Sequence, residues 1–241
     1  MKPIKSRFTL VEMLAVVAIA SILIALITPS VQKMMFGSTV DQCTSNLKLA
    51  LEQAQSKAVA SRKYVALILP TDHSHADAKM KTYCKSGYRM AYVKKDGETY
   101  KFANWIPGSE WKNPNNGAML ANITADSPGD TASTREAWAE TVKGNMTPAK
   151  VKGKPVKLSD IDLGGVSDPD FEALGSESSK SCAIIFSPYG GIVNNDQPLY
   201  FTVTECKYNG SDYELENTDN FLVLKLNAIT GRITYFDPYA E

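Results

Sequence analysis

The chain has 241 residues, of which 44% are hydrophobic, and its 26 basic residues equal its 26 acidic residues in number. This composition allows a hydrophobic core and argues against a general nucleic-acid-binding protein, which needs a strongly basic face. None of the four cysteines lies in a C-x-x-C spacing, so neither a zinc knuckle nor a dithiol redox motif is expected. The length suits one membrane helix followed by one further domain.

The N-terminal segment from Phe8 to Pro29 is almost purely apolar and contains one charged residue, Glu12. As a helix it would span about 30 Å, the thickness of a bilayer core. A carboxylate inside such a helix costs about 2.5–3.5 kcal/mol on insertion scales, so it requires an explanation. Basic residues occur only on the N-terminal side, which predicts a cytoplasmic N-terminus and a C-terminal domain across the membrane: Lys2, Lys5 and Arg7.

Three interpretations of this segment compete. A cleaved secretory signal peptide fits the basic start, but the apolar run is long and no small-x-small cleavage site follows it. A plain signal anchor fits the length and orientation but leaves Glu12 unexplained. The third interpretation rests on the run Arg7-Phe8-Thr9-Leu10-Val11-Glu12, followed by apolar residues and Pro29. This pattern resembles the class III signal of type IV prepilins and of type II secretion pseudopilins.

The resemblance implies cleavage of a basic leader, residues 1–7, between Arg7 and Phe8, with N-methylation of Phe8 by a prepilin peptidase. It also implies a role for Glu12, whose carboxylate would pair with the Phe8 amine of a neighbouring subunit during assembly. In the family a glycine usually precedes the cut, whereas this chain has Arg7. This bulky cation is a departure from the family pattern at the cleavage site.

A subunit of this family is a structural protein and not an enzyme. The resemblance implies a minor pilin or pseudopilin that is inserted in the inner membrane and later joins a periplasmic pseudopilus or surface filament. Its partners would be other pilin or pseudopilin subunits, the prepilin peptidase, the inner-membrane assembly platform, the lipid bilayer and secreted cargo. The alternative is a membrane-tethered periplasmic binding or hydrolytic domain that does not polymerise.

A long amphipathic helix is predicted to continue from 30 to 62, after a turn that Pro29 loosens. Apolar residues recur there at steps of three and four, which predicts one face that packs on a sheet: Val40, Cys43, Leu47, Leu51, Ala54 and Ala58. The segment Asn46–Tyr64 resembles the end of the long helix in H-type minor pseudopilins of type II secretion.

Strand patterns dominate the rest of the chain. A buried strand is predicted at 64–69, and a hairpin at 87–94 and 99–105, with Met90 and Tyr92 on one face and Tyr88 on the other. Further strands are predicted at 182–187, at 199–204 (half-buried), at 222–226 and around 233–235. The expected fold class is α+β, a long N-terminal helix on an antiparallel β-sheet in a globular domain, 63–241. The pieces 185–190 and 230–233 resemble the H-type pseudopilin sheet.

Between 107 and 180 the hydrophobic pattern weakens and glycine, proline, serine, aspartate and asparagine become frequent. This length exceeds an ordinary connection, so we interpret it as a loop-rich insertion that decorates the domain. One helical patch, 131–143, is predicted inside it.

Cys182 and Cys206 fall in two candidate strands and are the expected disulfide, because an exported domain would lie in an oxidising space. Four buried thiols are the alternative.

Other candidate chemistry is sparse. His73 and His75 fit a polar loop better than a metal site. Nucleic-acid binding is not expected, since the one lysine cluster, 150–157, fits a solvated loop. No cofactor is expected. Calcium is considered only for an acidic loop with oxygen ligands and no EF-hand spacing: Asp160, Asp162, Asp168 and Asp170.

Overall fold

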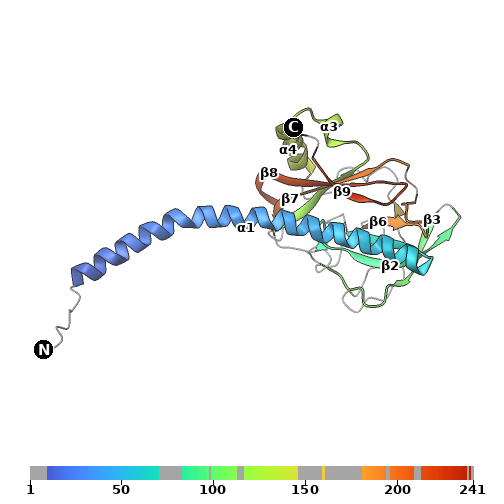
Figure 1. Cartoon of the computed structure of the whole chain (residues 1–241), viewed down its shortest axis with the longest axis horizontal. Coiled ribbons are helices and arrows are strands. Elements are labelled where there is room, and N and C mark those ends of the chain that lie inside the picture. The colour runs from blue at the N-terminus through green and yellow to red at the C-terminus, as the bar shows by residue number, and fades with distance from the viewer. Residues whose placement is uncertain are drawn as a thin grey trace. The chain divides into compact units, whose positions relative to one another are not determined.

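The protein is represented by a computed structural model that describes residues 10–70, 83–97, 99–112, 117–145, 159–160, 181–193, 196–208, 213–237 and 239. Two compact units are distinguished, 1–38 and 39–241, and each is described by itself. Figure 1 shows the elements, which are in chain order α1 (Leu10–Ser61), β1 (Tyr64–Pro70), β2 (Arg89–Asp96), β3 (Thr99–Trp105), β4 (Gly117–Thr124), α3 (Pro128–Thr131), α4 (Arg135–Asn145), β5 (Ser159–Asp160), β6 (Ser181–Phe186), β7 (Leu199–Tyr208), β8 (Tyr213–Leu226) and β9 (Ile233–Phe236). The predicted α+β class, a long N-terminal helix with antiparallel strands, is confirmed.

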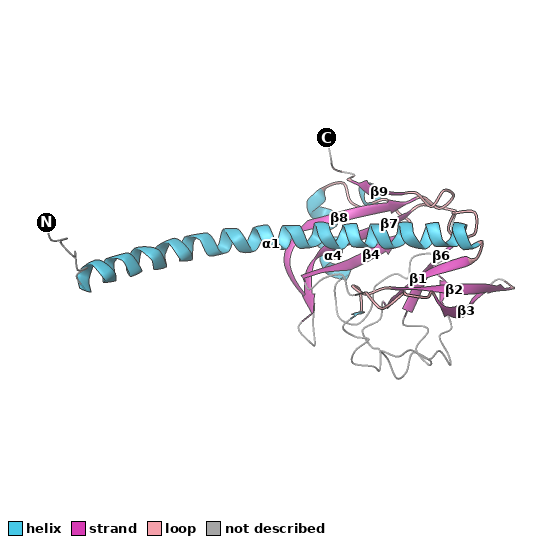
Figure 2. Ribbon diagram, turned by 60° about the horizontal axis from the view of Figure 1, so that its bottom comes forward, coloured by secondary structure: helices cyan, strands magenta, loops and turns pink. Residues whose placement is uncertain are grey.

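The second half of α1 packs against the strands through the predicted apolar face. Ala50 is buried with all six predicted residues, and the one polar residue buried among them, Thr44, donates its hydroxyl to the Val40 oxygen: Val40, Cys43, Leu47, Leu51, Ala54 and Ala58. The helix ends at Ser61 because Arg62 adopts a φ of 53°, and the chain turns at once into β1. Figure 2 shows this part of α1 lying alongside strands of both sheets.

The first sheet has the strand order β3-β2-β1-β6-β5, and all its pairs are antiparallel. Strand β1 is central. Val65, Leu67 and Leu69 share a core with α1, whereas Ala66 and Ile68 face a second core on the other side of the sheet. Because aromatic residues such as Tyr100 and Trp111 cover that second side, β1 is buried on both faces, as its continuous apolar run predicts.

The predicted hairpin is β2–β3, with Gly97 at a φ of 63° in the turn. The prediction that Tyr88 faces away from Met90 and Tyr92 is wrong. All three contact the core that includes α1, because side chains two residues apart point to the same side of a strand.

The second sheet has the order β4-β7-β8-β9 and is also antiparallel. Two sheets therefore replace the single expected sheet. Leu199, Phe201 and Val203 of β7 face the α1 core as predicted. The strand is not half-buried, however, because Thr202 and Thr204 on its other face are also fully buried. Helix α4 covers that face, and its Trp138 indole lies in a third core with Tyr200 of β7.

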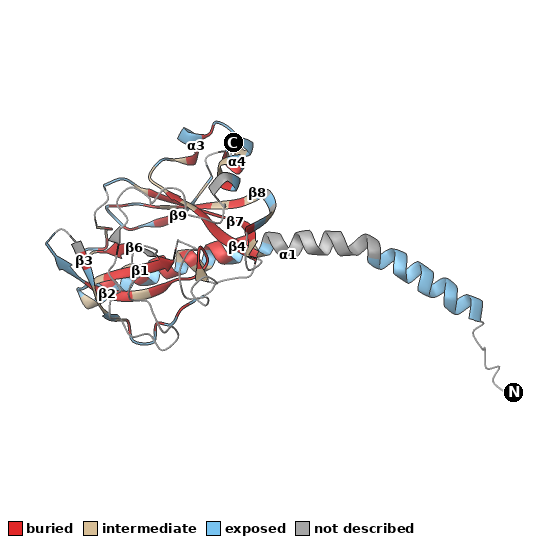
Figure 3. Cartoon of the chain, turned by 180° about the vertical axis from the view of Figure 1, so that it is seen from behind, coloured by how far each residue is buried: buried red, intermediate tan, exposed pale blue. Residues whose placement is uncertain are grey.

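In its described parts, 107–112, 117–145 and 159–160, the segment 107–180 is more ordered than a loop-rich insertion. Strand β4 lies inside it and pairs with β7, and α4 occupies most of the predicted helical patch. The strand was missed because its apolar run, 118–123, is short and periodicity alone does not assign such runs. Figure 3 shows the buried residues of β4, β7 and β8 in red between α1 and α4.

Replacing Trp138 with alanine tests whether α4 is part of the core or a decoration. Trp138 is 1% exposed, so the Trp138→Ala variant should lose about 3–5 kcal/mol of unfolding free energy. Urea unfolding of the detergent-solubilised chain, followed by circular dichroism, measures the loss. Tyr189→Ala is the control, because Tyr189 is 95% exposed and its removal should change stability by less than about 0.5 kcal/mol.

Candidate assembly site

The first described part of α1, Leu10–Ile24, exposes large apolar side chains on every side of the helix. Their exposed fractions run from 53% at Leu23 to 77% at Leu10, and Figure 3 shows this stretch in pale blue. Glu12, in the first turn, is its one charged residue. A helix that is apolar all round is stable only when lipid or other helices cover it. This unit therefore requires a covering partner.

Some predictions for this region lie outside what the structure describes. Arg7 and Phe8 precede the described residues, so cleavage and methylation stay predictions. The α1 backbone is helical through Pro29, so the proline does not end the helix. In the described part of the chain, no helix has both the length and the hydropathy that crossing a membrane requires.

Two turns pack on the C-terminal end of α1, and Gln55 joins them. Its side-chain nitrogen donates to the backbone oxygen of Gly190, at 2.9 Å, and of Thr230, at 2.7 Å. Gly231 adopts a φ of 66°, and a Cβ atom added there would collide with the Gly190 oxygen and the Gln55 side chain. The two turns therefore approach the helix as closely as glycine allows.

These turns present apolar side chains to solvent beside the helix. Tyr189 is 95% exposed, Ile229 is 80% exposed, and Val59 of α1 is 48% exposed. A Cβ atom at Gly190 would lie 3.6 Å from Val59 and 3.9 Å from the Thr230 oxygen, which places the three segments together. We call Val59, Tyr189 and Ile229 the turn patch.

The turn patch is held on a rigid backbone. Asn227 Oδ1 accepts hydrogen bonds from the backbone N–H groups of Ile229 (3.1 Å) and Thr230 (2.9 Å), and from the Thr230 hydroxyl (3.0 Å). The Gly190 N–H donates to the Ser187 oxygen, which closes the first turn. A partner that covers this surface therefore has little additional backbone to order.

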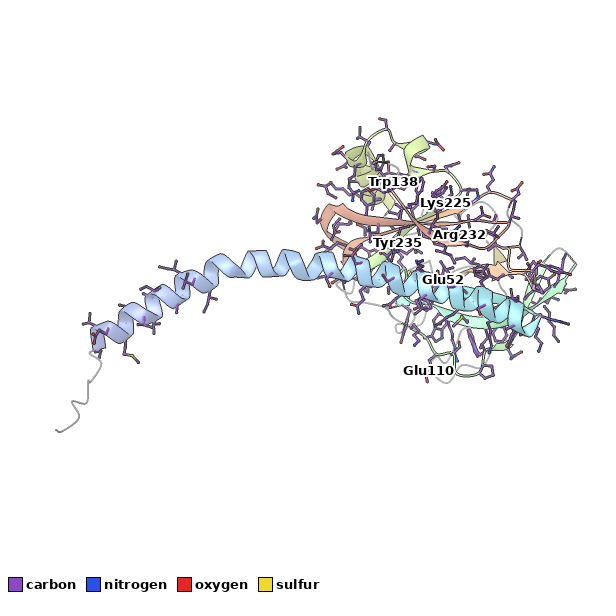
Figure 4. All side chains as sticks on the ribbon, in the orientation of Figure 1. Glu52, Glu110, Trp138, Lys225, Arg232 and Tyr235 are labelled. Carbon is purple, nitrogen blue, oxygen red and sulfur yellow. The ribbon has the colours of Figure 1, made fainter. Side chains whose placement is uncertain are left out.

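A polar surface continues along α1 toward β9. Lys48 lies 3.6 Å from Glu52 and 5.4 Å from the centre of the Tyr235 ring, whose hydroxyl also hydrogen-bonds Ser45 at 2.9 Å. Figure 4 shows Glu52 on α1 with Tyr235 and Arg232 above it. These contacts are exposed and contribute little to stability, but they place both charges and an aromatic ring along one side of α1.

On another side of α1, a groove of about 400 Å³ lies between the helix and the loop after β3. Leu49 and Gln53 of α1 line one wall, and Glu110 and Lys112 of the loop line another. Arg89, also on the lining, stacks over the Trp105 ring at 4.2 Å and is almost fully buried. The groove is therefore mixed in charge and does not present a basic track for nucleic acid.

The predicted disulfide between Cys182 and Cys206 does not form. Cys182 lies on β6 in the first sheet and Cys206 lies on β7 in the second sheet, and the Cys206 thiol is free. The prediction assumed that both strands belong to one sheet, which is wrong. Burial raises the pKa of the Cys206 thiol to about 12, which disfavours the reactive thiolate form.

The other candidate ligands are not brought together in the described residues. Asp160 lies on β5, whereas Asp162, Asp168, Asp170, His73 and His75 lie outside the described part of the chain. The described residues contain no group of three potential metal ligands. Calcium therefore stays an untested expectation.

Sequence reasoning missed two features of this surface. Gln55 falls on the polar side of the predicted amphipathic helix, and nothing in the periodicity indicates that it joins two distant turns. The turns themselves carried a signal, because Pro188–Gly191 and Thr230–Gly231 are turn sequences. Only packing shows that they meet at one residue of α1.

Neither a protein-family model nor a curated protein sequence matches this chain. Among solved structures, the chain is similar to the minor pseudopilin EpsH of the type 2 secretion system of Vibrio cholerae, with 8% identity and a TM-score of 0.40 over 84% of this chain and 99% of that one. It is also similar to the type IV minor pilin FimU of Pseudomonas aeruginosa. In one crystal form of FimU the identity is 10% and the TM-score 0.38, over 83% of this chain and 89% of that one. In another the identity is 12% and the TM-score 0.37, over 82% and 93%. At these values the similarity by itself does not establish membership of a family.

Gly231 and Gly97 form a matched pair that tests the close packing of the turns on α1. Both adopt a positive φ, 66° and 63°, but an added Cβ would meet nothing within 4 Å at Gly97 and would collide at Gly231. Gly97→Ala should cost about 1–2 kcal/mol for the left-handed backbone alone. Gly231→Ala should cost clearly more, by at least about 1 kcal/mol, in the same urea unfolding assay. Equal losses would contradict the close contact.

Proposed function

We propose that this protein is a structural, non-enzymatic subunit of the minor pilin or pseudopilin kind. The observation that carries the proposal is the Leu10–Ile24 helix, which is apolar on every side and holds one carboxylate in its first turn. The N-terminal motif from Arg7 to Glu12 supports the same conclusion, because it resembles a prepilin signal.

Glu12 is the residue that separates assembly from simple tethering. A tether requires an apolar helix and gains nothing from a carboxylate, whereas a carboxylate in a low-dielectric environment is stabilised by a nearby cation. Cleavage after Arg7 would create such a cation, the methylated amine of Phe8. Pairing between Glu12 of one subunit and Phe8 of its neighbour would then set the stagger of packed helices.

The globular unit would serve as the docking part of the subunit. The turn patch of Val59, Tyr189 and Ile229 is apolar, exposed and rigidly held, which suits contact with a neighbouring subunit or with cargo. The proposed location is the inner membrane, with the N-terminus in the cytoplasm and the globular unit in the periplasm, followed by a pseudopilus or surface filament.

A membrane-tethered domain that does not polymerise is the second candidate function. It is favoured by the mixed groove beside Leu49 and Arg89, which offers a binding surface independent of assembly. The two functions differ in the fate of the N-terminus. An assembled subunit begins at a methylated Phe8, whereas a tether keeps residues 1–7.

N-terminal peptide mapping by mass spectrometry decides between them. Full-length protein, produced together with a prepilin peptidase and isolated from membranes, should yield a first peptide that begins at N-methylated Phe8. Omission of the peptidase should leave Met1–Arg7 attached. An intact leader in the presence of an active peptidase would contradict the proposal, and Arg7→Gly then tests whether the arginine alone prevents cleavage.

Replacing Glu12 with glutamine tests the charge pairing. Glu12→Gln keeps the shape of the side chain and removes its charge, so the variant should insert in the membrane and be cleaved normally but fail to enter filaments. The measurement is the share of the protein in sheared filaments relative to membranes, and a tenfold or larger decrease is expected. Glu52→Gln is the control, because Glu52 is an exposed carboxylate on the same helix, outside the apolar segment. Equal incorporation of both variants would refute the pairing.

A further inference from the structure

The groove between α1 and the loop after β3 can be assigned a class of ligand from the chemistry of its walls. Its volume of about 400 Å³ is in the range of ligand-binding sites. All of its lining residues belong to the unit 39–241, so the groove does not include the apolar helix at the N-terminus. Figure 4 shows Glu110 of this loop on the side of α1 away from Tyr235 and Arg232.

Hydrogen bonds to the segment 88–90 fix the loop wall of the groove. The Ser109 hydroxyl donates to the Met90 oxygen at 2.9 Å, and the Met90 N–H donates to the Ser109 hydroxyl oxygen at 3.3 Å. The backbones of Tyr88 and Lys112 exchange two further hydrogen bonds, both of 2.9 Å. The groove is therefore preformed, and a ligand does not have to order it.

The α1 wall carries two side-chain amides with an apolar residue between them. Asn46 and Gln53 both line the groove, and Leu49 between them is 52% exposed. Neither side-chain amide makes a hydrogen bond within the described part of the chain. The two residues are seven positions apart, which corresponds to about 10.5 Å along the helix.

The loop wall carries two exposed side chains of opposite charge. Glu110 and Lys112 line the groove, whereas Trp111 between them is buried in the core on the other side of the first sheet. This alternation is that of an extended chain and separates the two charged residues by about 7 Å. Arg89, a third charged residue on the lining, is almost fully buried and stacks on the Trp105 ring at 4.2 Å.

Both spacings match the repeat of an extended polypeptide. Three residues of an extended chain span about 10 Å, the separation of Asn46 and Gln53, and two residues span about 7 Å, the separation of Glu110 and Lys112. A side-chain amide donates and accepts, and so does each backbone amide of an extended segment. Asn46 and Gln53 can therefore each hold one peptide group of such a segment.

Other classes of ligand use these walls less well. A helix satisfies its own backbone groups, so it would leave the amides of Asn46 and Gln53 without backbone partners. An apolar chain would cover the same amides and the two charges without pairing them. Nucleic acid requires a basic track, and Glu110 interrupts the positive charge of this groove.

We propose that this groove binds an extended segment of another polypeptide. Two peptide groups of the segment, three residues apart, bond to Asn46 and Gln53, and an apolar side chain of the segment packs on Leu49. A cationic side chain faces Glu110, and an anionic side chain two residues away faces Lys112. This binding goes beyond the proposed function and does not depend on filament assembly.

Four capped, fluorescein-labelled heptapeptides test the charges. Each has a central leucine flanked by two charged residues and then by alanines, and the charged pairs are Lys/Glu, Glu/Lys, Lys/Lys and Glu/Glu. Fluorescence polarisation with the full-length chain in detergent should show one of the mixed peptides binding about fivefold more tightly than either like-charged peptide. Absence of saturable binding by all four peptides would overturn the proposal.

Single charge reversals in the groove should change which peptide binds best. Glu110→Lys makes the loop wall cationic, so the Glu/Glu peptide should become the tightest ligand. Lys112→Glu makes it anionic, so the Lys/Lys peptide should become the tightest. An unchanged order of affinities in both variants would place the peptide elsewhere on the molecule and refute the site.

Removing one side-chain amide tests the contact with the peptide backbone. Gln53→Met keeps the length of the side chain and removes its hydrogen bonds, so the Kd of the tightest peptide should rise about fivefold to tenfold. Lys57→Met is the matched control, because Lys57 is exposed on the same helix and does not line the groove. An equal Kd for Gln53→Met and Lys57→Met would contradict the role of the amide.

A photoreactive peptide locates the site without any substitution in the protein. The central leucine of the tightest peptide is replaced by its diazirine analogue, and the crosslinked residues are mapped by mass spectrometry. Labels within 46–53, 88–90 or 106–112 are expected. Labels confined to other segments would overturn the proposal, as would labelling that disappears while the protein forms dimers, because a second copy would then occupy the groove.

The Glu12→Gln variant separates this inference from the proposed function. Glu12 lies in the other unit, so the variant should bind the peptides with the same Kd as the wild-type chain. Normal peptide binding by a chain that keeps residues 1–7 in the presence of the peptidase would contradict only the proposed function. A chain that is cleaved and enters filaments but binds none of the peptides would contradict only the groove.

Discussion

The burial of one face of α1 against both sheets is the contact on which the globular unit depends. Seven residues from Val40 to Ala58 form this face, and Val65 and Phe201 meet it from the two sheets. Three of the seven are alanines, which let the helix backbone lie close to the strands. In the described part of the chain no strand ladder joins the two sheets, so they are connected by their common contact with α1 and by backbone hydrogen bonds between neighbouring segments, such as that from the Leu120 N–H of β4 to the Lys85 oxygen.

The remaining layers follow from covering the outer faces of the sheets. Aromatic residues cover the outer face of the first sheet, and α4 covers that of the second. The segment that contains α4 has the sequence pattern of a surface insertion, but it completes a hydrophobic core. Its Trp138 side chain is buried in the same core as Cys206. The polar residues buried there, Lys85 among them, are accommodated by contacts with an aromatic ring and with backbone groups of both sheets.

The two described parts of α1 show how one helix can belong to two environments. From Val40 onward, apolar residues occupy one face and the strands cover them. Between Leu10 and Ile24 they occupy every face, and the chain offers no cover among its described residues. The first pattern suits a fold within one molecule, and the second suits lipid or neighbouring helices. Glu12 lies in the segment that is apolar on every face, and it is the residue that would pair with a neighbouring subunit in the proposed assembly.

The helix, its buried face, the β1 strand and the β2–β3 hairpin could all be predicted from the sequence, because they depend on local periodicity and turn residues. The apolar N-terminal segment and its single carboxylate, Glu12, can also be identified directly from the sequence. The division into two sheets, the pairing of β4 with β7, the junction of two turns at Gln55 and the neighbours of Cys206 could not be predicted. These depend on which strands lie side by side, and period-two patterns are alike for every possible pairing. Contacts between residues distant in the chain form only when the core packs. Tertiary packing, and not the local sequence pattern, therefore decided which strands and turns became neighbours.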